Sequence, residues 1–530
     1  MLKASFVKYS ETGFFSKLIL DYISGKPELK GFYEYAPELS SFSKKIKDRK
    51  RIPVERTLLA DVLAQQNKSL KANEKVLDNI ELLKNSGTFT VTTGHQLNLF
   101  TGPLYFVYKI ISTINLAEQL KHEFPDNNFV PIYWMHCEDH DFKEINHIHL
   151  FGKKIEWKGD HHGAAGEIST ASLRSVIDEL KTVLGESENA NELITLFSEA
   201  YLRHINLADA TRYLCHELFG RFGLVILDAR DVRLKKTFVQ QFKEDILHNT
   251  GFKAVSTTNV ELQKSNYKVQ VSPREINCFY FAEGRRERIV KTDKGFQVLN
   301  TSLLFSKEEL EKEIESHPEK FSHNVVLRPL YQEHILPNLA YIGGAGELAY
   351  WLQYKSMFVA AKISFPVLVL RNSVMVIDKT ITAKIEKLGL TAKDFFSAED
   401  KLVGDFIATN STAETGLKNE QEKLKELFSS IKAKAAKVDI TLEASIEAEL
   451  QKQLKIIEQL ESRIQRAERK KYENSINQLK SIREKLFPAN SLQERHENVS
   501  SFYLRYGRTF IPDLKFNIRP LDFNFLLVED

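Results

Sequence analysis

The chain has 530 residues, of which 42% are hydrophobic and 27% are charged, and it carries a formal net charge of +3. This length allows roughly three domains with at least one large core, and the composition is ordinary for a globular protein in water. A near-neutral charge argues against a chain built to bind nucleic acid or an anionic membrane surface.

Cysteine usage and hydropathy predict a cytoplasmic protein with no membrane partner. Cys137, Cys215 and Cys278 are far apart and form no CxxC pair, as expected in a reducing compartment. The N-terminus lacks a basic region followed by an uninterrupted apolar run, so no signal peptide is predicted. The longest apolar stretch, residues 357–370, is broken by polar residues and is too short to span a bilayer.

The first 120 residues are predicted to form helices and then a strand, a turn and a helix. Residues 1–85 have mainly helical periodicity, with one long helix over 57–83. A β-favouring run at 89–93 leads into a polar, glycine-punctuated turn at 94–103 and an apolar-periodic helix at 104–120. Such a unit is how open α/β sheets present backbone N–H groups and a helix N-terminus to an anion.

Apolar runs at residues 129–135, 223–228 and 365–370 are typical of buried parallel strands. Because these runs alternate with helical stretches, the sequence predicts an α/β fold with a doubly wound parallel sheet.

This core is expected to cover residues 1–380, with two interruptions. The first, at about residues 148–205, is predicted to form a hairpin and helices. Within about 250–320, apolar and polar residues alternate at 269–281 and 289–304, on either side of a Gly-Arg-Arg-Glu-Arg turn, which predicts a partly β insertion with antiparallel strands.

Residues 384–506 are charge-rich and predicted to be helical. Apolar residues recur there at three- and four-residue steps, with a register shift near Lys471 and an end at Pro488. A break at Asp439 separates two arms, which predicts an antiparallel helical hairpin whose second arm is roughly 65–70 Å long. Since an apolar stripe needs burial, a homodimer through this coiled coil is expected. The tail at 507–530 is apolar enough to return to the core.

Polar residues follow the predicted strands, at the edge where open α/β sheets bind ligands. These clusters are Gly94, His95 and Gln96; Glu138, Asp139, His140 and Asp141; Asp228, Arg230 and Asp231; and Arg371 and Asn372. A second glycine-rich turn, formed by Gly343, Gly344, Gly346 and Glu347, precedes a helix and could bring backbone close to a ligand. Neither turn is a Walker A motif or a complete GxGxxG.

The segment from His136 to His147 is open to three interpretations. Its histidine, cysteine and carboxylate groups are metal ligands, but the spacing matches neither HExxH nor a Cys/His quartet, and no metal site is assigned. As an acid/base site, its carboxylates would bind an ammonium group while His140 moves protons near neutral pH. As a structural feature, it would be a satisfied polar network that fixes the loop. Cys137 has no assigned base and is interpreted as a bystander.

Three long strings, TTGHQLNLFTGPLYFVYKIIS, PIYWMHCEDHDFKEINH and EHILPNLAYIGGAGELAYWLQ, resemble the cysteine-adding enzymes of bacillithiol biosynthesis, a family also described as cysteine ligases. The resemblance covers essentially the whole chain. It implies a Rossmann-like core with connecting insertions and a C-terminal α-helical coiled coil that mediates dimerisation. The implied reaction joins cysteine to the amine of glucosaminyl-malate, the last step in making bacillithiol.

The resemblance also implies a set of site residues. The family's first turn falls on Gly94, Gln96, Phe100, Thr101, Gly102 and Pro103, its acidic segment on Glu138, Asp139, His140, Asp141, Glu144 and Asn146, and its late turn on Gly343, Gly344, Gly346 and Glu347. The first turn is also similar to the histidine-containing signature of nucleotidylyltransferases and class I synthetases, with His95 as its one histidine. That similarity implies an adenylate-forming mechanism.

Amide formation from a free carboxylate is uphill at neutral pH and needs activation, so we expect a nucleotide donor, ATP with Mg²⁺ as companion ion. Backbone N–H groups of the turn from Gly94 to Gly102 and the next helix N-terminus would hold phosphate charge. Lys109, Arg328 or Arg371 would supply a nearby cation.

The acidic segment would bind the other substrate. Glu138, Asp139 and Asp141 would hold the amine, and His140 would accept its proton. Two alternatives remain from other classes. One is a metal-dependent hydrolase built on residues 138–147, and the other is a non-catalytic scaffold organised by the coiled coil.

Overall fold

The computed structural model describes residues 3–71, 73–411, 413 and 415–530. The chain forms two compact units. The first contains the residues up to Val376 together with Ser491–Asp530, and the second contains Ile377–Asn490. The coiled-coil segment is therefore inserted into the chain of the first unit. No helix among the described residues is both long and apolar enough to cross a membrane.

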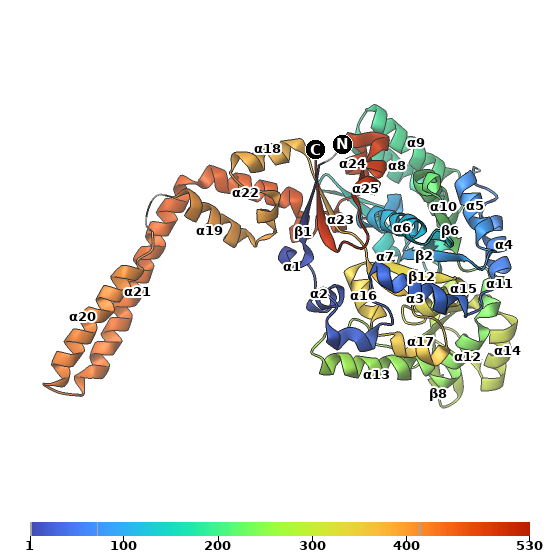
Figure 1. Ribbon diagram of the computed structural model, residues 1–530, viewed down its shortest axis with the longest axis horizontal. Helices are drawn as coiled ribbons and strands as arrows, with labels where there is room; N and C mark the ends of the chain where they lie inside the picture. Colours follow the sequence, from blue (N-terminus) through green and yellow to red (C-terminus); the bar gives the residue numbers. More distant parts are fainter. Residues whose placement is uncertain (1–2, 72, 412, 414) are drawn as a thin grey trace. The chain divides into compact units, whose positions relative to one another are not determined.

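The first unit is built on a five-stranded sheet in the order β13-β12-β2-β3-β6 (Figure 1). Its strands are β2 (Thr88–His95), β3 (Asn128–Met135), β6 (Val225–Asp228), β12 (Asn338–Gly343) and β13 (Val367–Leu370). Every neighbouring pair is parallel. The residues of all five strands are almost wholly buried, as expected for a sheet that is covered on both faces. The predicted doubly wound parallel sheet is confirmed.

Helices pack on the strands of this sheet. α6 (Tyr105–Glu123) packs on β2 and β3, α3 (Leu39–Lys50) packs on β12, and α10 (Leu207–Phe219) packs on β6. α6 buries most of its length, from Phe106 to Leu120, which explains why its apolar periodicity was readable in the sequence.

The long helix predicted over residues 57–83 is wrong. The structure has two helices, α4 (Arg56–Asn67) and α5 (Glu74–Leu82). Between Leu63 and Val76 the only large apolar residue is Leu70, so no continuous apolar stripe joins the two helices across this stretch. A strand that the helical prediction missed, β1 (Lys3–Lys8), precedes them and is mostly exposed.

A second sheet, in the order β1-β15-β14, joins the two ends of the first unit. β15 (Asn524–Glu529) pairs antiparallel with β1 along its whole length and also neighbours β14 (Val374–Ile377). The helices α23 (Gln493–His496) and α24 (Val499–Tyr506) also belong to this unit, although the sequence grouped them with the coiled coil.

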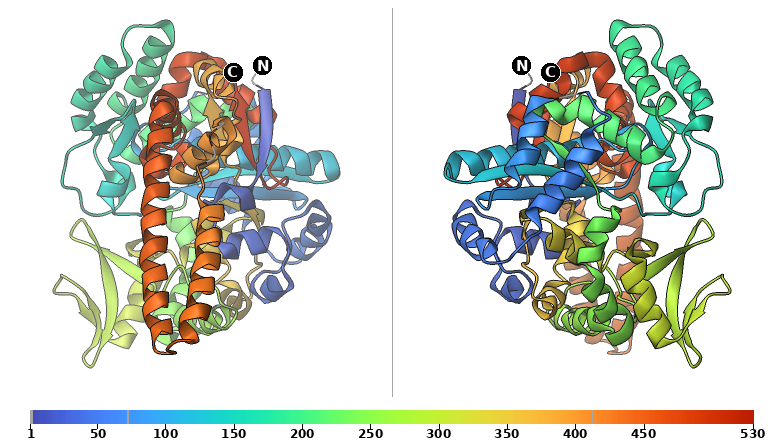
Figure 2. Two further views of the ribbon diagram at one scale, coloured as in Figure 1. Left: turned by 90° about the vertical axis from the view of Figure 1, so that its left-hand side faces the viewer. Right: turned by 90° about the vertical axis from the view of Figure 1, so that its right-hand side faces the viewer.

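Two insertions carry further elements of the first unit. One contains the hairpin β4 (His147–Leu150) and β5 (Lys153–Glu156), with α8 (Arg174–Leu184) and α9 (Glu188–Leu202). The other contains α13 (Thr250–Lys264), α14 (Lys307–Ser316) and an antiparallel sheet in the order β10-β9-β8-β7-β11. Its strands are β7 (Cys278–Ala282), β8 (Arg285–Thr292), β9 (Gly295–Val298), β10 (Leu304–Phe305) and β11 (Phe321–His323). α8 and α9 lie apart from this sheet in both views of Figure 2.

The predicted strand from Val269 is shorter than expected. Residues 269–277 are irregular, and only Cys278–Ala282 pairs with β8. Four of these irregular residues, Gln270, Val271, Ser272 and Arg274, line the cavity described below instead of joining the sheet.

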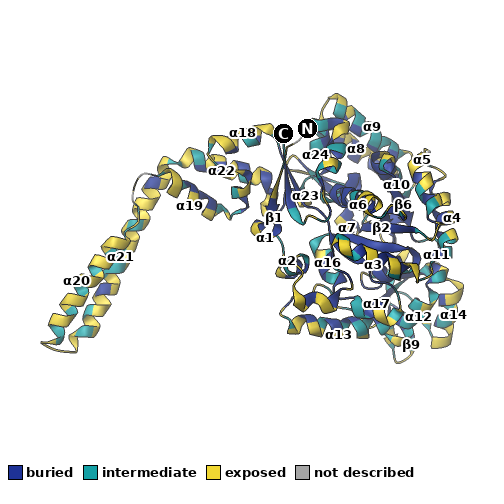
Figure 3. Ribbon diagram, viewed as in Figure 1, coloured by how far each residue is buried: buried dark blue, intermediate teal, exposed yellow. Residues whose placement is uncertain are grey.

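The second unit is helical, and Figure 1 shows α20 (Lys418–Ala436) and α21 (Leu442–Lys471) side by side as the predicted hairpin. The second arm continues as α22 (Glu473–Leu486) after a break at Tyr472, next to the register shift expected near Lys471. Most of α20 and α21 is exposed (Figure 3). The exposed apolar residues of these arms include Leu427, Ile431, Ile456, Leu460 and Ile464.

Candidate active site

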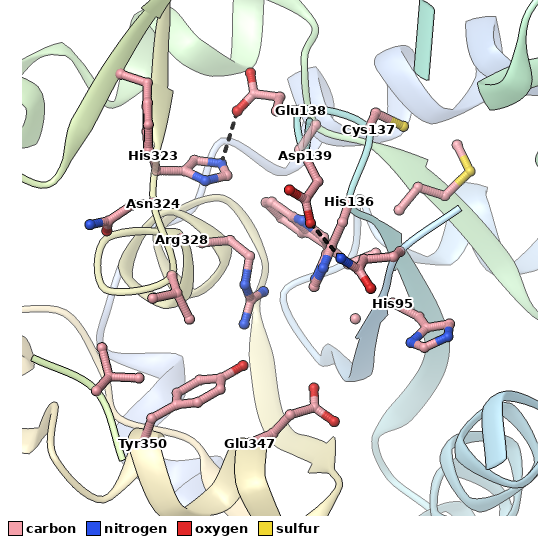
Figure 4. A pocket seen from close by; sticks show the side chains of 18 of the residues that line it. His95, His136, Cys137, Glu138, Asp139, His323, Asn324, Arg328, Glu347 and Tyr350 are labelled. Atoms are coloured by element: carbon pink, nitrogen blue, oxygen red, sulfur yellow. Dashed lines mark hydrogen bonds and ion pairs between the residues drawn. The ribbon is translucent and has the colours of Figure 1, made fainter. Parts of the chain in front are cut away.

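A cavity of about 730 Å³ opens at the carboxyl edge of the central sheet, within the first unit. Residues at the ends of β2 and β3, on α6 and on the helix α16 (Ala345–Trp351) line it, as do Phe279 and Arg286 from the β insertion. Figure 4 shows the polar groups that face it. This is the place where open α/β sheets bind ligands.

Cations outnumber anions in the cavity wall. The cationic lining residues are Lys109, Arg230, Arg274, Arg286 and Arg328, and the acidic ones are Glu138, Asp139 and Glu347. The lining histidines add little charge near neutral pH, because burial lowers the pKa of both His95 and His323 to about 3. A cavity with this balance favours a ligand that carries negative charge.

Lys109 ties the predicted glycine-rich turn to the late helix. Its ammonium donates to the Gly94 carbonyl at 2.5 Å and to both carboxylate oxygens of Glu347, at 3.0 and 2.8 Å. Glu347 also accepts from the Gly344 N–H at 2.8 Å and from the Tyr341 hydroxyl at 2.7 Å. Burial raises the pKa of Glu347, but Lys109 outweighs it and holds that pKa below its ordinary value.

His95 lies against the aromatic side chains of α6. Its ring stacks on Phe106 with centroids 5.0 Å apart and meets Tyr105 edge-on. In the described part of the chain, its Nε2 has no hydrogen-bond partner. His95 is therefore a neutral imidazole that lines the cavity.

Gln96 joins the first turn to the acidic segment. Its amide donates to Asp139 at 2.7 Å and to Glu144 at 2.6 Å. Asp139 also accepts from the His140 N–H at 2.8 Å, so its carboxylate is held at the cavity wall. Two clusters predicted from separate strands thus meet.

Glu138 is already neutralised in the fold. It forms a buried ion pair with Lys235 and accepts from the Ser322 hydroxyl at 3.0 Å, with His323 Nε2 3.4 Å away. Burial alone would raise the pKa of Glu138, but Lys235, followed by His323, brings it below the ordinary value. The negative charge of Glu138 is therefore compensated by these contacts within the protein.

His140 and Asp141 lie beside the lining residues. His140 is exposed, and its Nδ1 is 3.0 Å from Nη1 of Arg286, which lines the cavity. Burial of the ring and then the charge of Arg286 lower the pKa of His140. Asp141 accepts from the Glu144 N–H at 3.4 Å as the N-cap of a short helix.

The other predicted residues are not among those that line the cavity. They are Thr101, Gly102, Asn146, Gly343, Gly344, Gly346 and Arg371. Gly102 has φ +65°, and Asn98 fills the space a side chain would need. The Asn146 amide donates to the Trp157 carbonyl, and Arg371 pairs with buried Glu494 at 2.7 Å. Gly102, Asn146 and Arg371 therefore make contacts that stabilise the fold.

Several lining residues escaped the sequence analysis, among them Arg274, Arg286, His323 and Tyr350, as did Lys235 behind the wall. Arg286 lies in the recognised Gly-Arg-Arg-Glu-Arg turn, where a run of arginines was a usable signal. The others stand in stretches without an evident motif, and only the tertiary fold brings them to the sheet edge.

The described residues around the cavity offer neither a set of metal ligands nor a reactive nucleophile. Among the described residues, no group of three or more histidine, cysteine, aspartate or glutamate side chains could hold a metal ion. Cys137 is buried, and burial raises the pKa of its thiol, with Asp228 adding to the effect. A protonated thiol is a poor nucleophile.

Comparisons with known proteins agree with the fold and with the sequence motifs. Residues 2–372 match the description "Bacillithiol biosynthesis BshC, N-terminal Rossmann-like domain", and residues 374–529 match "Bacillithiol biosynthesis BshC, C-terminal coiled-coil domain". A relative from Flavobacterium johnsoniae, named "Putative cysteine ligase BshC", is 44% identical and covers 98% of this chain and 99% of its own. A relative of the same name from Cytophaga hutchinsonii is 38% identical over 96% of both chains. The chain thus belongs to the BshC family of bacillithiol biosynthesis, with the family's Rossmann-like and coiled-coil domains.

Proposed function

We propose that this protein is a carbon–nitrogen ligase that joins the carboxylate of cysteine to the amine of glucosaminyl-malate, with a nucleotide supplying the activation. The carrying observation is the cavity at the sheet edge, which is rich in cations and has Asp139 and a neutral His140 at one side. The names of the relatives point to the same reaction class.

The charge of the cavity fits the substrates. Glucosaminyl-malate carries the carboxylates of its malyl group, and cysteine carries one more. Arg274 and Arg286 come from the insertion and line the cavity together with Arg328. Guanidinium groups bind carboxylates in two-point geometry, so they suit these ligands.

Asp139 and His140 fit the handling of the amine. The Asp139 carboxylate is oriented by Gln96 and is available to an ammonium group in the cavity. His140 Nδ1 is 3.9 Å from Asp139 Oδ1, and the lowered pKa keeps its imidazole neutral near pH 7. A neutral imidazole next to a bound amine accepts the proton that the amine loses on attack.

The residues also fit a nucleotide phosphate. Arg328 is buried, lines the cavity and has a guanidinium nitrogen, Nη2, without a hydrogen-bond partner in the described parts of the chain. Lys109 and Arg371 already pair with Glu347 and Glu494, so Arg328 is the cation we assign to the phosphate. Cleavage of a phosphoanhydride bond in a nucleoside triphosphate held there, with Mg²⁺ as companion ion, would make amide formation downhill.

The test is incubation of the purified full chain with cysteine, glucosaminyl-malate and ATP, with bacillithiol and AMP or ADP as products to detect. Asp139→Asn and His140→Ala should each lower kcat by about a hundredfold, since general acid–base catalysis contributes at least this much. Asp126→Asn and His122→Ala, exposed and outside the cavity lining, are the matched controls. Absence of product with every nucleotide tried, from folded protein, overturns the proposal.

A further inference from the structure

Two buried nitrogen donors remain unused at the cavity wall. His136 follows β3, and its Nε2 has no hydrogen-bond partner among the residues that the structure describes. Arg328 begins the helix α15 (Arg328–Ile335), and its Nη1 donates to Gln332 at 2.9 Å while Nη2 is unpaired within the same described set. Arg328 is only 5% exposed. Buried donors without partners are costly in a fold and commonly mark a ligand site.

The two side chains converge on one spot above Gly94. A Cβ atom placed on Gly94 would lie 2.6 Å from His136 Nε2 and 3.5 Å from Arg328 Nη1. Figure 4 shows the two side chains near one another in the cavity wall. Gly94 is the penultimate residue of β2 and has no side chain, so the His136 imidazole and the Arg328 guanidinium can both approach the strand at this point.

The surroundings hold these donors in place. The Arg328 guanidinium lies over the rings of Tyr341 and Trp351, with centroid distances of 5.5 and 5.9 Å. Burial, and after it the charge of Arg328, lowers the pKa of His136 well below its ordinary value. A neutral imidazole that carries its proton on Nε2 donates one hydrogen bond, and Arg328 adds a charged donor beside it.

We propose that His136 and Arg328 form an oxyanion subsite above Gly94, which binds one anionic oxygen group of the ligands used by this cavity. The group is a phosphate of the nucleotide or a carboxylate of a substrate, since both present oxygens to the same two donors. The subsite deepens the proposed function and rests on it for the identity of the ligands. It gives His136 a role in binding that the sequence did not suggest.

The test measures binding without turnover. Inorganic phosphate and malate are titrated separately into the full chain by isothermal calorimetry, in the absence of cysteine. His136→Leu and Arg328→Met should weaken at least one of the two anions by about tenfold or more, the range expected for losing a charge-assisted hydrogen bond. His136→Gln places an amide donor near the same point and should restore most of the binding.

A glycine pair provides a further check. Gly94→Ala places a methyl group within 3 Å of His136 Nε2, so it should displace the imidazole and weaken the same anion as His136→Leu. Gly404→Ala is the matched control, because Gly404 lies in an exposed helical position with no atom within 4 Å of an added Cβ. Circular dichroism melting confirms that each variant is folded.

The two anions show whether the subsite binds a nucleotide phosphate or a substrate carboxylate. Weakening of phosphate alone assigns the subsite to the nucleotide, weakening of malate alone assigns it to a substrate carboxylate, and either result supports the subsite. Unchanged binding of both anions in His136→Leu and Arg328→Met overturns it, and so does a parent protein that binds neither anion. Equal losses in His136→Gln and His136→Leu overturn the donor role of His136. Since no turnover is involved, a negative ligase assay leaves the binding result intact.

Discussion

Glu138 was expected to bind the substrate amine, but in the structure its carboxylate contacts other residues of the protein. Its carboxylate is paired with Lys235 and hydrogen-bonded to Ser322, both of which are almost fully buried. An ion pair inside the protein is costly to break, because the remaining charge is left without compensation. We therefore interpret Glu138 as a residue that fixes the path of the acidic segment, with Asp139 next to it free to bind.

Lys235→Met should lower the free energy of unfolding by about 3–5 kcal/mol, the cost of leaving a buried charge unpaired. The double variant Lys235→Met/Glu138→Gln should recover a large part of this loss, because it removes both charges. Urea unfolding followed by circular dichroism measures each value. A single variant as stable as the parent would contradict the buried ion pair.

The same pair predicts how stability depends on pH. The pKa of Glu138 in the folded chain is below its ordinary value, so the pair stabilises the fold fully above the pKa of the unfolded chain. This stability is lost as the pH falls from the ordinary glutamate pKa of about 4.3 through the lower, folded pKa. Glu138→Gln should flatten the acid limb of a stability–pH curve measured by urea unfolding. An unchanged limb would assign the acid sensitivity to other carboxylates.

Arg286 should set the titration of His140. Its guanidinium is 3.0 Å from His140 Nδ1, and its charge helps to lower the pKa of that imidazole. In Arg286→Gln the pKa of His140 should rise, and the acid limb of the kcat profile should move to higher pH. An NMR titration of the His140 ring protons measures the shift directly. Lys291→Gln, on the same strand β8 but outside the cavity lining, is the matched control.

At the scale of elements, one salt bridge joins β2, α6 and α16. Lys109 comes from α6 and contacts the Gly94 carbonyl on β2, while Glu347 comes from the first turn of α16. The Lys109 side chain is 2% exposed, and burial lowers its pKa despite the opposing charge of Glu347. The glycine-rich turns predicted as two separate anion sites are thus linked through their side chains.

Glu347→Gln should lower the free energy of unfolding by about 2–3 kcal/mol, since Lys109 loses a charged hydrogen-bond partner. In a double-mutant cycle with Lys109→Met, the two effects should be strongly non-additive, with a coupling of more than about 1 kcal/mol. Additive effects would mean that the contact contributes little. Amide hydrogen exchange at Gly344 should become faster in Glu347→Gln, because that N–H donates to the carboxylate.

The elements that could be predicted are those whose own residues carry the signal. β3 and β6 are continuous apolar runs, and α6 has apolar periodicity along its length. β1 has no such signal, because only Val7 among its six residues is buried and its structure depends on pairing with β15 at the other end of the chain. The split between α4 and α5 was missed because the apolar spacing on either side of the polar stretch suits one helix as well as two.

At the scale of the whole molecule, the helical hairpin leaves apolar surface uncovered. Ile456, Leu460 and Ile464 recur every four residues on α21 and are 47, 44 and 42% exposed. Residues at this spacing share one face of a helix. An exposed stripe of this kind is typical of a protein–protein contact, and we propose a homodimer through the coiled coil.

Leu460→Glu should convert the dimer into a monomer or weaken it by at least about tenfold, because a charge would be buried in the apolar contact. Light scattering coupled to size-exclusion chromatography measures the mass. Ser462→Glu adds the same charge about half a turn away on α21 and should leave the dimer intact. A monomeric parent protein at micromolar concentration would refute the proposal.

The site could be predicted only in part from the sequence, because the whole fold brings several of its residues together. Gly94, Gln96 and Asp139 were found because each lies at or just beyond the end of a strand that is visible in the sequence. Arg274 and His323 were not found, because their positions depend on how the β insertion folds back on the sheet edge, and Lys235 was not found because only the folded chain brings it to Glu138. Arg371 was assigned to phosphate from its place after β13, but its partner Glu494 comes from far along the chain.

The insertion of the coiled-coil segment into the chain of the first unit has a consequence for synthesis. β15 lies between β1 and β14, so both of these strands lack this partner until residues 524–529 have left the ribosome. At translation rates of about 5–20 residues per second, the helical hairpin delays that moment by several seconds. During this interval the unfinished first unit exposes strand edges that pair readily with other chains. The nascent protein is therefore expected to need a chaperone more than a chain with its strands in sequence order would.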